Sequence, residues 1–397
     1  VLVAISFLII LLSSLLYEGF NGFTQTTIKI PINFSEKIID PEQTKNIQII
    51  KKASYRKIFK QSILKQFPEA KDNRKLYRDI SKLFSRGSPY ILKNMVINDL
   101  NLIGKTIDVT LIASSEIDQL RKNKINRNVP ENERPISDVT LKIYDQLMAE
   151  DLIKKRFNMS FMGQGDSRNP EEAGILGALI GSILTLLITL LLSFPIGVLT
   201  AVYLEEFAPN NKFTYFIEIN INNLAAVPSI VFGLLGLAIF LNFFELPRSV
   251  PLTGGMVLTL MTLPTVIISS RASLKAVPPS IREAALGLGA SKLQAVFNHV
   301  VPSAAPGMFT GTIIGMARAL GETAPLLLMG MVAFIVEIPT SIFDPATVLP
   351  AQIYLWADSP ERGFVEKTSA AIIVLVIFLI IMNSLAIWLR RKFEVRW

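Results

Sequence analysis

Two charges of opposite sign lie within one of the apolar stretches of the chain, in the segment ARALGETAP at residues 317–325. Arg318 and Glu322 are four residues apart, so a helix would place them on one face. A guanidinium is permanently charged, and its fork of donors matches two oxygens of a phosphate group. The pair therefore suits the passage of an anion, with Glu322 holding Arg318 when no anion is present. The alternative is a structural pair whose two charges only neutralise each other.

A second segment, residues 277–302 (VPPSIREAALGLGASKLQAVFNHVVP), combines residues that start helices with residues that end them. Ser280 with Glu283 three residues later forms a capping box, and a second box begins at Ser291. Gly289 lies between them, where a glycine is typical of the end of a short helix. The pattern predicts two short helices joined by a turn. An ordinary helical hairpin on a loop would show the same pattern.

Composition excludes several classes of site. The chain of 397 residues has no cysteine and one histidine, His299. Disulfides, thiolate metal sites and cysteine nucleophiles are therefore excluded, as is a zinc site with several histidine ligands. The sequence also lacks a G-x-x-x-x-G-K-[ST] phosphate loop, so the chain cannot itself supply ATP hydrolysis. We expect no catalytic residue and no metal site.

The elements that must position these residues are membrane helices, because half of the residues (50%) are hydrophobic and the mean hydropathy is +0.44. A helix needs about 20 mostly apolar residues to cross a bilayer. The first apolar segment is short, so we expect residues before Val1 to be missing and the segment to be an uncleaved anchor. A cleaved signal peptide is the rival interpretation, but residues 13–19 (SSLLYEG) lack a small-x-small cleavage pattern. Six segments qualify or nearly qualify as spans: about 1–16, 174–203, 222–244, 252–270, 304–335 and 370–389.

Basic residues in the short loops predict the orientation, because such loops stay in the cytoplasm. The loop at 204–218 departs from this trend, with Glu205, Glu206 and Glu218 against Lys212. Six spans place both termini in the cytoplasm of a multi-pass membrane protein. The basic residues that set this orientation are, in the C-terminal tail, Arg390, Arg391, Lys392 and Arg396, and, between spans four and five, Arg271, Lys275, Arg282 and Lys292.

Residues 18–172 then lie outside the membrane, and they carry 27 Lys+Arg against 20 Asp+Glu, nearly all of the excess charge. The bases are interspersed with acids, which favours a solvated surface over a nucleic-acid interface. We expect a mixed α+β domain here. Its predicted strands and helices are, respectively, 27–34 and 105–113, and about 42–65, 71–85 and 136–156.

The segment 277–302 resembles the EAA motif of ABC importer permeases. The family normally ends this motif with Ile-x-Leu-Pro, whereas this chain has His-Val-Val-Pro, a departure that affects packing more than identity. The resemblance implies a coupling helix that docks in a groove of a separate ATPase subunit. The residues that match the motif are Glu283, Ala284, Ala285, Gly289 and Pro302.

Three further segments, RALGETAPLLLMG, REAALGLGAS and NINNLAAVPSIVFGLLGLAIF, resemble the PstA family of phosphate importer permeases over about 174–397. The sister family PstC shares Arg-Ala-Leu-Gly-Glu-Thr but usually lacks the following Ala324 and Pro325. The resemblance implies that Arg318 and Glu322 line the substrate pathway. Arg271 matches another family arginine, with a pathway role or a positive-inside anchor as the two interpretations.

The fold class implied is an all-α polytopic membrane protein with six transmembrane helices of the ABC importer permease (MetI-like) fold, carrying an α+β extracytoplasmic domain after the first helix. The expected domains are 1–17 for the first helix, 18–172 for the external domain and 173–397 for the permease domain. The external domain resembles the N-terminal extension of a subset of PstA proteins and has no assigned role. The implied partners are the permease PstC, two copies of the ATPase PstB, the periplasmic phosphate-binding protein PstS, phosphate and the lipid bilayer, without nucleic acid. The chain itself would bind no cofactor, because ATP and magnesium belong to the ATPase.

Three other functions remain open at this point. The first is a permease for another oxyanion or nutrient, since many importers share the EAA motif. The second is a membrane-anchored sensor or interaction protein that works through 18–172, although such a protein would need only one or two anchors. The third is an ion-coupled carrier independent of ATP, which would show internal repeats and need no coupling loop.

Overall fold

The computed structural model describes residues 2–392, so Arg396 of the predicted cytoplasmic tail lies outside the described residues. The chain forms two compact units, which are described separately. Unit 1 comprises the chain up to Gly174 together with Ser359–Ala370. Unit 2 comprises Ile175–Asp358 and the chain from Ala371 onward.

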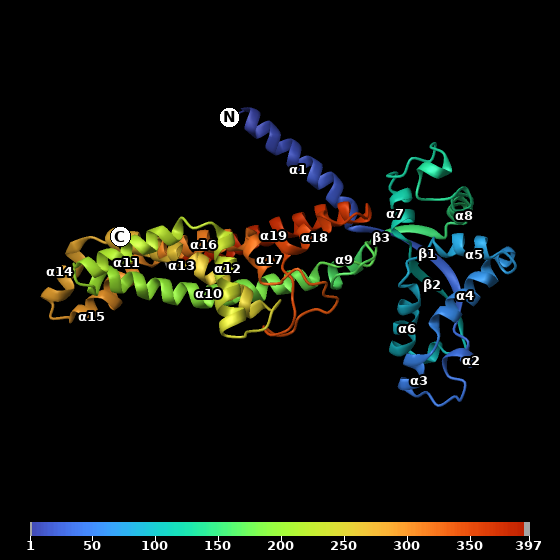
Figure 1. The fold of residues 1–397 in the computed structure, drawn as a ribbon, viewed down its shortest axis with the longest axis horizontal. Coiled ribbons are helices and arrows are strands. Elements are labelled where there is room, and N and C mark those ends of the chain that lie inside the picture. The colour runs from blue at the N-terminus through green and yellow to red at the C-terminus, as the bar shows by residue number, and fades with distance from the viewer. Residues whose placement is uncertain (1, 393–397) are drawn as a thin grey trace. The chain divides into compact units, whose positions relative to one another are not determined.

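Unit 1 contains a three-stranded antiparallel sheet in the order β2-β1-β3 (Figure 1). The central strand β1 is Thr24–Asn33, and it pairs with β2 (Thr106–Ile112) and β3 (Ile153–Phe157). In the register, Ile30 lies opposite Val109. The central strand therefore has partners on both edges, which is why most of its residues are buried.

Helices surround this sheet, and several begin at a side-chain cap. The side chains of Asn46, Asn73 and Ser137 accept hydrogen bonds from backbone N–H groups of the first turn, as N-cap residues do. Short 3₁₀ turns occur at Pro68–Ala70, Leu100–Leu102 and Glu131–Glu133. The helices of unit 1 are α1 (Leu2–Gly22), α2 (Glu36–Ile39), α3 (Ile47–Lys52), α4 (Tyr55–Gln66), α5 (Arg74–Ser81), α6 (Ser88–Asn98), α7 (Ser115–Arg121), α8 (Asp138–Ala149) and α9 (Met159–Gly163).

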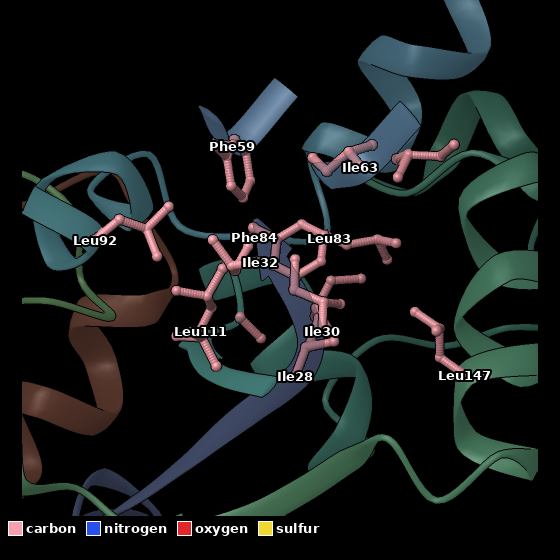
Figure 2. Close-up of a cluster of buried hydrophobic side chains, with 14 of the residues drawn as sticks. Ile28, Ile30, Ile32, Phe59, Ile63, Leu83, Phe84, Leu92, Leu111 and Leu147 are labelled. Atoms are coloured by element: carbon pink, nitrogen blue, oxygen red, sulfur yellow. The ribbon is translucent and has the colours of Figure 1, made fainter. Parts of the chain in front are cut away.

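The core of unit 1 forms on one face of β1. Ile28, Ile30 and Ile32 alternate along the strand, point to the same side and are at most 1% exposed. Figure 2 shows them packed against Phe59 and Ile63 of α4. The large apolar side chains of α1, by contrast, are mostly exposed, as expected of a helix that faces lipid.

Unit 2 is helical. Three helices continue directly into π-turns. These turns are Tyr203–Phe207 after α10, Leu237–Phe243 after α12, and Val296–Val300, which lies between α15 and α16. The last helix, α19, begins within unit 1 and continues into unit 2. The helices are α10 (Leu176–Val202), α11 (Lys212–Ala225), α12 (Ser229–Gly236), α13 (Pro251–Lys275), α14 (Pro279–Gly287), α15 (Lys292–Ala295), α16 (Val301–Gly321), α17 (Ala324–Leu328), α18 (Leu349–Ala357) and α19 (Gly363–Lys392).

Within the described residues, five helices are long and apolar enough to cross a membrane, or six if one bent pair is a single span. The bent pair is Lys212–Ala225 with Ser229–Phe243, and the chain bends by 105° between these two helices. Pro228 lies at this bend, and a proline disfavours helical geometry in the residue before it. The span predicted at 222–244 is therefore not one straight helix. The six predicted spans correspond to the larger of the two counts.

Two other predicted elements were wrong in extent. The span predicted at 304–335 ends as a helix at Gly321. The helix predicted at 136–156 ends at Ala149, because the chain turns at Asp151 (φ 55°) and enters β3. Helical periodicity cannot distinguish a short edge strand that follows a helix within a few residues.

The long helices α10, α13 and α16 pack closely through small residues. A Cβ atom at Gly197 or Gly255 would collide with the facing helix, and one at Gly311 would collide with Ser269 of α13. Small residues let helix backbones approach closely. In a membrane the lipid tails are as apolar as the side chains, so close packing rather than the hydrophobic effect holds helices together. This packing fixes α16, the helix that carries Arg318.

Candidate functional site

The predicted Arg318–Glu322 segment lies at a break between two helices of unit 2. Arg318 is in the last turn of α16, and Glu322 follows the helix with an extended backbone (φ −79°, ψ 124°). The next helix, α17, begins at Ala324 with Pro325 in its first turn. Pro325 has no N–H to donate into α16, so the sequence Gly-Glu-Thr-Ala-Pro favours an interruption here. Interrupted helices are frequent at binding sites of membrane transporters.

The geometry leaves Arg318 with capacity to bind a further group. Its Nε lies 3.5 Å from Glu322 Oε1, the one acidic oxygen within 4.0 Å among the described residues. The side chain of Arg318 is 47% exposed, whereas that of Glu322 is 18% exposed. A guanidinium has five N–H donors, and most of those of Arg318 have no acceptor in the part of the chain that the structure describes. The end of α16 also favours a cation, because the helix dipole is negative there.

The neighbours of Arg318 in the sequence anchor the helix end. Ala319 and Leu320 are at most 2% exposed and belong to an apolar cluster with Leu326 of α17 and Met261 of α13. Gly233 of α12 approaches Pro325 so closely that a Cβ there would collide with it. One face of the break is therefore packed in apolar core while the arginine lies on the open face.

Arg271, the other predicted pathway residue, lies near the end of α13 in a different environment. Its Nη2 is 2.7 Å from Glu218 Oε1 and its Nε is 3.4 Å from Glu205 Oε2, and its side chain is 16% exposed. No recorded contact joins Arg271 to Arg318 or Glu322 among the described residues. Arg318 lies 17 residues into α16, so about 25 Å of helix separates it from the 277–302 hairpin that follows Arg271.

The 277–302 hairpin folds as two short helices, α14 and α15, with a turn at Gly289. This glycine has φ +87°, a conformation that residues with a Cβ rarely adopt. The capping box predicted at Ser291 is confirmed, since Ser291 and Gln294 exchange both hydrogen bonds. The box predicted at Ser280 with Glu283 is wrong. The two consecutive prolines start α14 two residues earlier, with Pro278 in the cap position and no side-chain cap.

The tip of this hairpin presents an exposed surface with apolar side chains. Glu283, Ala284 and Gly289 are exposed, and Ala285 packs inward. Leu288 is 90% exposed and Leu293 60% exposed, as a surface that meets a partner chain requires. Pro302 lies in the first turn of α16.

The sequence did not identify the partners of the acidic residues at 205, 206 and 218. In the structure each of these glutamates pairs with a base: Glu205 with Arg271 and Lys275, Glu206 with Arg282, and Glu218 with Arg271. The available signal was that these three unpaired acids and a group of basic residues occur in two neighbouring loop regions, so each could neutralise the other. This pairing also accounts for the acids that departed from the charge pattern of the loops.

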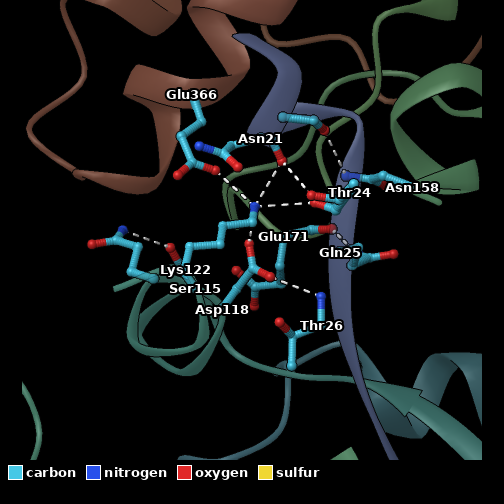
Figure 3. Close-up of polar contacts among 12 residues, drawn as sticks. Asn21, Thr24, Gln25, Thr26, Ser115, Asp118, Lys122, Asn158, Glu171 and Glu366 are labelled. Atoms are coloured by element: carbon cyan, nitrogen blue, oxygen red, sulfur yellow. Dashed lines mark hydrogen bonds and ion pairs between the residues drawn. The ribbon is translucent and has the colours of Figure 1, made fainter. Parts of the chain in front are cut away.

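Unit 1 contains a separate buried cluster of charges around Lys122, whose side chain is 3% exposed. Its Nζ lies 2.6 Å from Asp118 Oδ2 and 2.7 Å from Glu366 Oε2 (Figure 3). It also donates to the backbone oxygens of Asn21 at 2.8 Å and Thr24 at 3.0 Å. A small cavity of about 20 Å³, enough for about one water molecule, adjoins this cluster.

Both parts of the chain match known protein families. Residues 193–397 match the family described as "Binding-protein-dependent transport system inner membrane component", and residues 1–131 match a domain of unknown function, DUF3333. A probable ABC transporter permease protein, YqgI of Bacillus subtilis (strain 168), is 33% identical over 59% of this chain and 83% of its own length. The phosphate transport system permease protein PstA of Mycobacterium leprae (strain TN) is 33% identical over 52% of this chain and 68% of its own.

The sister protein PstC of Haemophilus influenzae is also similar, at 30% identity over 53% of this chain and 73% of its own length. Among solved structures, the inward-facing MetNI methionine ABC transporter matches 54% of this chain and 95% of its own, at 18% identity and a TM-score of 0.44. The family match, the relatives and the apolar helices identify a multi-pass membrane component of an ABC importer, with ATP hydrolysis in separate subunits. The chain belongs to the family of binding-protein-dependent transport system inner membrane components and is a homologue of the PstA permeases.

Proposed function

We propose that this chain is the PstA-type permease subunit of an ATP-driven importer of inorganic phosphate. The observation that carries the proposal is the position of Arg318. It lies at the break between α16 and α17, nearly half exposed, with a single carboxylate partner at 3.5 Å. An arginine with spare donors at a helix break suits a hydrated oxyanion, because the guanidinium replaces part of the anion's hydration. Similarity to PstA proteins supports phosphate as that oxyanion.

Glu322 would act as the resting partner of Arg318. When no anion is present, the carboxylate neutralises the guanidinium and lowers the cost of a charge within the membrane. An arriving phosphate competes with this carboxylate for the same donors. Arg271 is a weaker candidate for the pathway than Arg318, since two carboxylates occupy its donors.

The proposed topology has six spans, with the bent pair of α11 and α12 counted as one. Both termini and the 277–302 hairpin lie in the cytoplasm, following the basic residues of these segments. Residues 18–172 then form an α+β domain on the periplasmic side. The hairpin docks on the ATPase PstB, and PstC and PstS complete the translocation path and deliver phosphate.

The test is phosphate uptake by the complete transporter with Arg318→Gln. Losing two charge-assisted hydrogen bonds, each worth about 1.5–3 kcal/mol, would lower uptake roughly a hundredfold or more. Membrane insertion and co-purification with the ATPase should stay unchanged. Arg318→Lys, which keeps the charge without the fork, should retain more uptake than Arg318→Gln. Uptake near the wild-type level in Arg318→Gln would contradict the role of this residue.

A permease for another oxyanion or nutrient is the alternative function. Labelled phosphate uptake in the presence of unlabelled phosphate, arsenate, sulfate or methionine distinguishes the two. Competition by phosphate and arsenate alone supports the proposal. Transport of a different solute, with no phosphate uptake by the wild-type complex, would assign the chain to another importer of the same family.

A further inference from the structure

The end of α10 has an unusual backbone. Residues Tyr203–Phe207 form a π-turn in which the N–H of Ala208 donates to the carbonyl oxygen of Tyr203 at 2.8 Å. Single π-turns of this kind are rare and occur frequently at functional sites. This one carries two consecutive carboxylates, Glu205 and Glu206, which pair with different elements of unit 2.

Glu206 connects the π-turn to the first helix of the hairpin. Its side chain is 8% exposed, and its Oε1 lies 2.7 Å from Nη2 and 3.2 Å from Nε of Arg282 on α14. Arg282 also donates from Nη1 to Val277 O at 2.8 Å and from Nη2 to Leu274 O at 2.9 Å. One guanidinium therefore joins the hairpin, the end of α13 and the π-turn.

The second helix of the hairpin contacts the same π-turn. Lys292 of α15 places its Nζ 5.3 Å from the centre of the Phe207 ring, within the range of a cation–π contact. Beneath these polar contacts, Val296 and Val300 pack in an apolar cluster with Val202 and Leu204. Both helices of the hairpin therefore contact the same π-turn, which follows α10.

The π-turn is connected in the other direction to two long helices. Glu205 pairs with Arg271 of α13 at 3.4 Å and with Lys275 at 3.7 Å. Arg271 in turn binds Glu218 of α11 at 2.7 Å. The two adjacent carboxylates therefore have different partners: Glu206 pairs with the hairpin, and Glu205 pairs with α13.

We propose that the π-turn Tyr203–Phe207 is the element through which movement of the 277–302 hairpin reaches α10, α11 and α13. Glu206 and Arg282 form its positioning pair. The inference rests on the proposed function, since it requires that the hairpin docks on an ATPase. An ion pair held by several hydrogen bonds moves as a unit, whereas apolar contacts alone allow the hairpin to slip when the pair is lost.

The test measures coupling rather than assembly. The complete transporter in proteoliposomes is compared as wild type, Glu206→Gln, Arg282→Gln and the double variant, with Glu245→Gln as control. Glu245 is exposed in the same unit and has no recorded ion pair among the described residues. Each single variant should lower the phosphate transported per ATP hydrolysed about tenfold, in the usual range of coupling free energies. Basal hydrolysis, measured without the binding protein, and ATPase co-purification should change less than about twofold.

Because Glu206 acts on the hairpin through Arg282, the double variant should be no worse than Arg282→Gln alone. Unchanged transport per ATP, additive losses, or loss of the ATPase from the purified complex would overturn the proposal. If the wild-type complex transports no phosphate, the proposed function fails, but the π-turn is still tested by stimulation of hydrolysis by the binding protein. Stimulation that persists in Glu206→Gln would then refute the role of the π-turn.

Discussion

Lys122 in unit 1 and Arg318 in unit 2 are both cations beside carboxylates, yet their surroundings differ. Four oxygens surround the three N–H donors of Lys122, and its side chain is 3% exposed. Arg318 has one carboxylate for five donors and is 47% exposed. The first cation has no capacity left for a ligand, whereas the second does.

The elements that these cations join differ as well. Lys122, which directly follows α7, binds Asn21 near the end of α1, Thr24 at the start of β1 and Glu366 in the first turn of α19, all within unit 1 (Figure 3). Among the described residues, the one ion pair of Arg318 is with Glu322 in its own segment, four residues along the chain. A cation that connects distant segments stabilises the fold, and one that connects none is available for function. The predictions below test that distinction.

The largest effect is expected for Lys122→Met. Removing the ammonium leaves the carboxylate of Asp118 with no cation within 4.0 Å among the described residues, and that of Glu366 with only Lys124 at 4.0 Å. Breaking a buried ion pair in this way costs about 3–5 kcal/mol. Pulse proteolysis of the full chain in urea, followed by detection of cleavage within unit 1, measures the loss of stability.

The matched control for Lys122 is Lys29→Met. Lys29 forms an ion pair with Asp108 at 2.8 Å, but both side chains are about half exposed. The loss should then be below about 1 kcal/mol. A triple variant, Lys122→Met with Asp118→Asn and Glu366→Gln, should recover part of the stability. Equal losses for Lys122→Met and Lys29→Met would show that burial of the ion pair does not determine its contribution to stability.

An intermediate effect is expected at Glu171, a carboxyl of unit 1 with no cation within 4.0 Å among the described residues. The pKa of Glu171 is raised from 4.5 to about 7, and burial is the largest of the several influences on it. The folded chain therefore holds a proton on this group between these two values. Its contribution to stability is complete below pH 4.5 and is lost as the pH rises through 7.

Glu171→Gln should remove this pH dependence, because the amide resembles the protonated acid. The variant should match the wild type near pH 4.5 and be more stable by about 3 kcal/mol at pH 8. The rate of proteolysis of unit 1 across this pH range provides the measurement. A parallel pH dependence in both proteins would show that Glu171 is ionised in the folded chain, as a paired carboxylate would be.

Local sequence patterns predicted much of the fold. The strands at 27–34 and 105–113 correspond to β1 and β2 within a few residues, because alternation of apolar and polar residues is a local signal. The helix at 42–65 is divided by Ala53 and Ser54 into α3 and α4. Boundaries of this kind depend on caps and turns that the periodicity does not show.

The sites differed in how far the sequence could predict them. The Arg318–Glu322 contact is local, since the two residues are four apart in one element. The Glu206–Arg282 pair joins residues 76 positions apart, and the Lys122–Glu366 pair joins residues 244 apart. Such pairs depend on which helices pack together, and no spacing in one sequence carries that information.

The smallest effect on stability is expected for Arg318→Gln. A half-exposed arginine with one partner contributes little to folding, so unfolding of unit 2 should change by less than about 1 kcal/mol. Fluorescence of Trp356 and Trp388, both in unit 2, reports this transition during heating. The variant would then lose phosphate uptake while keeping its stability, the reverse of Lys122→Met. A loss above about 2 kcal/mol would mean that Arg318 holds the α16–α17 break together, and its spare donors would then reflect a missing structural partner rather than a site for phosphate.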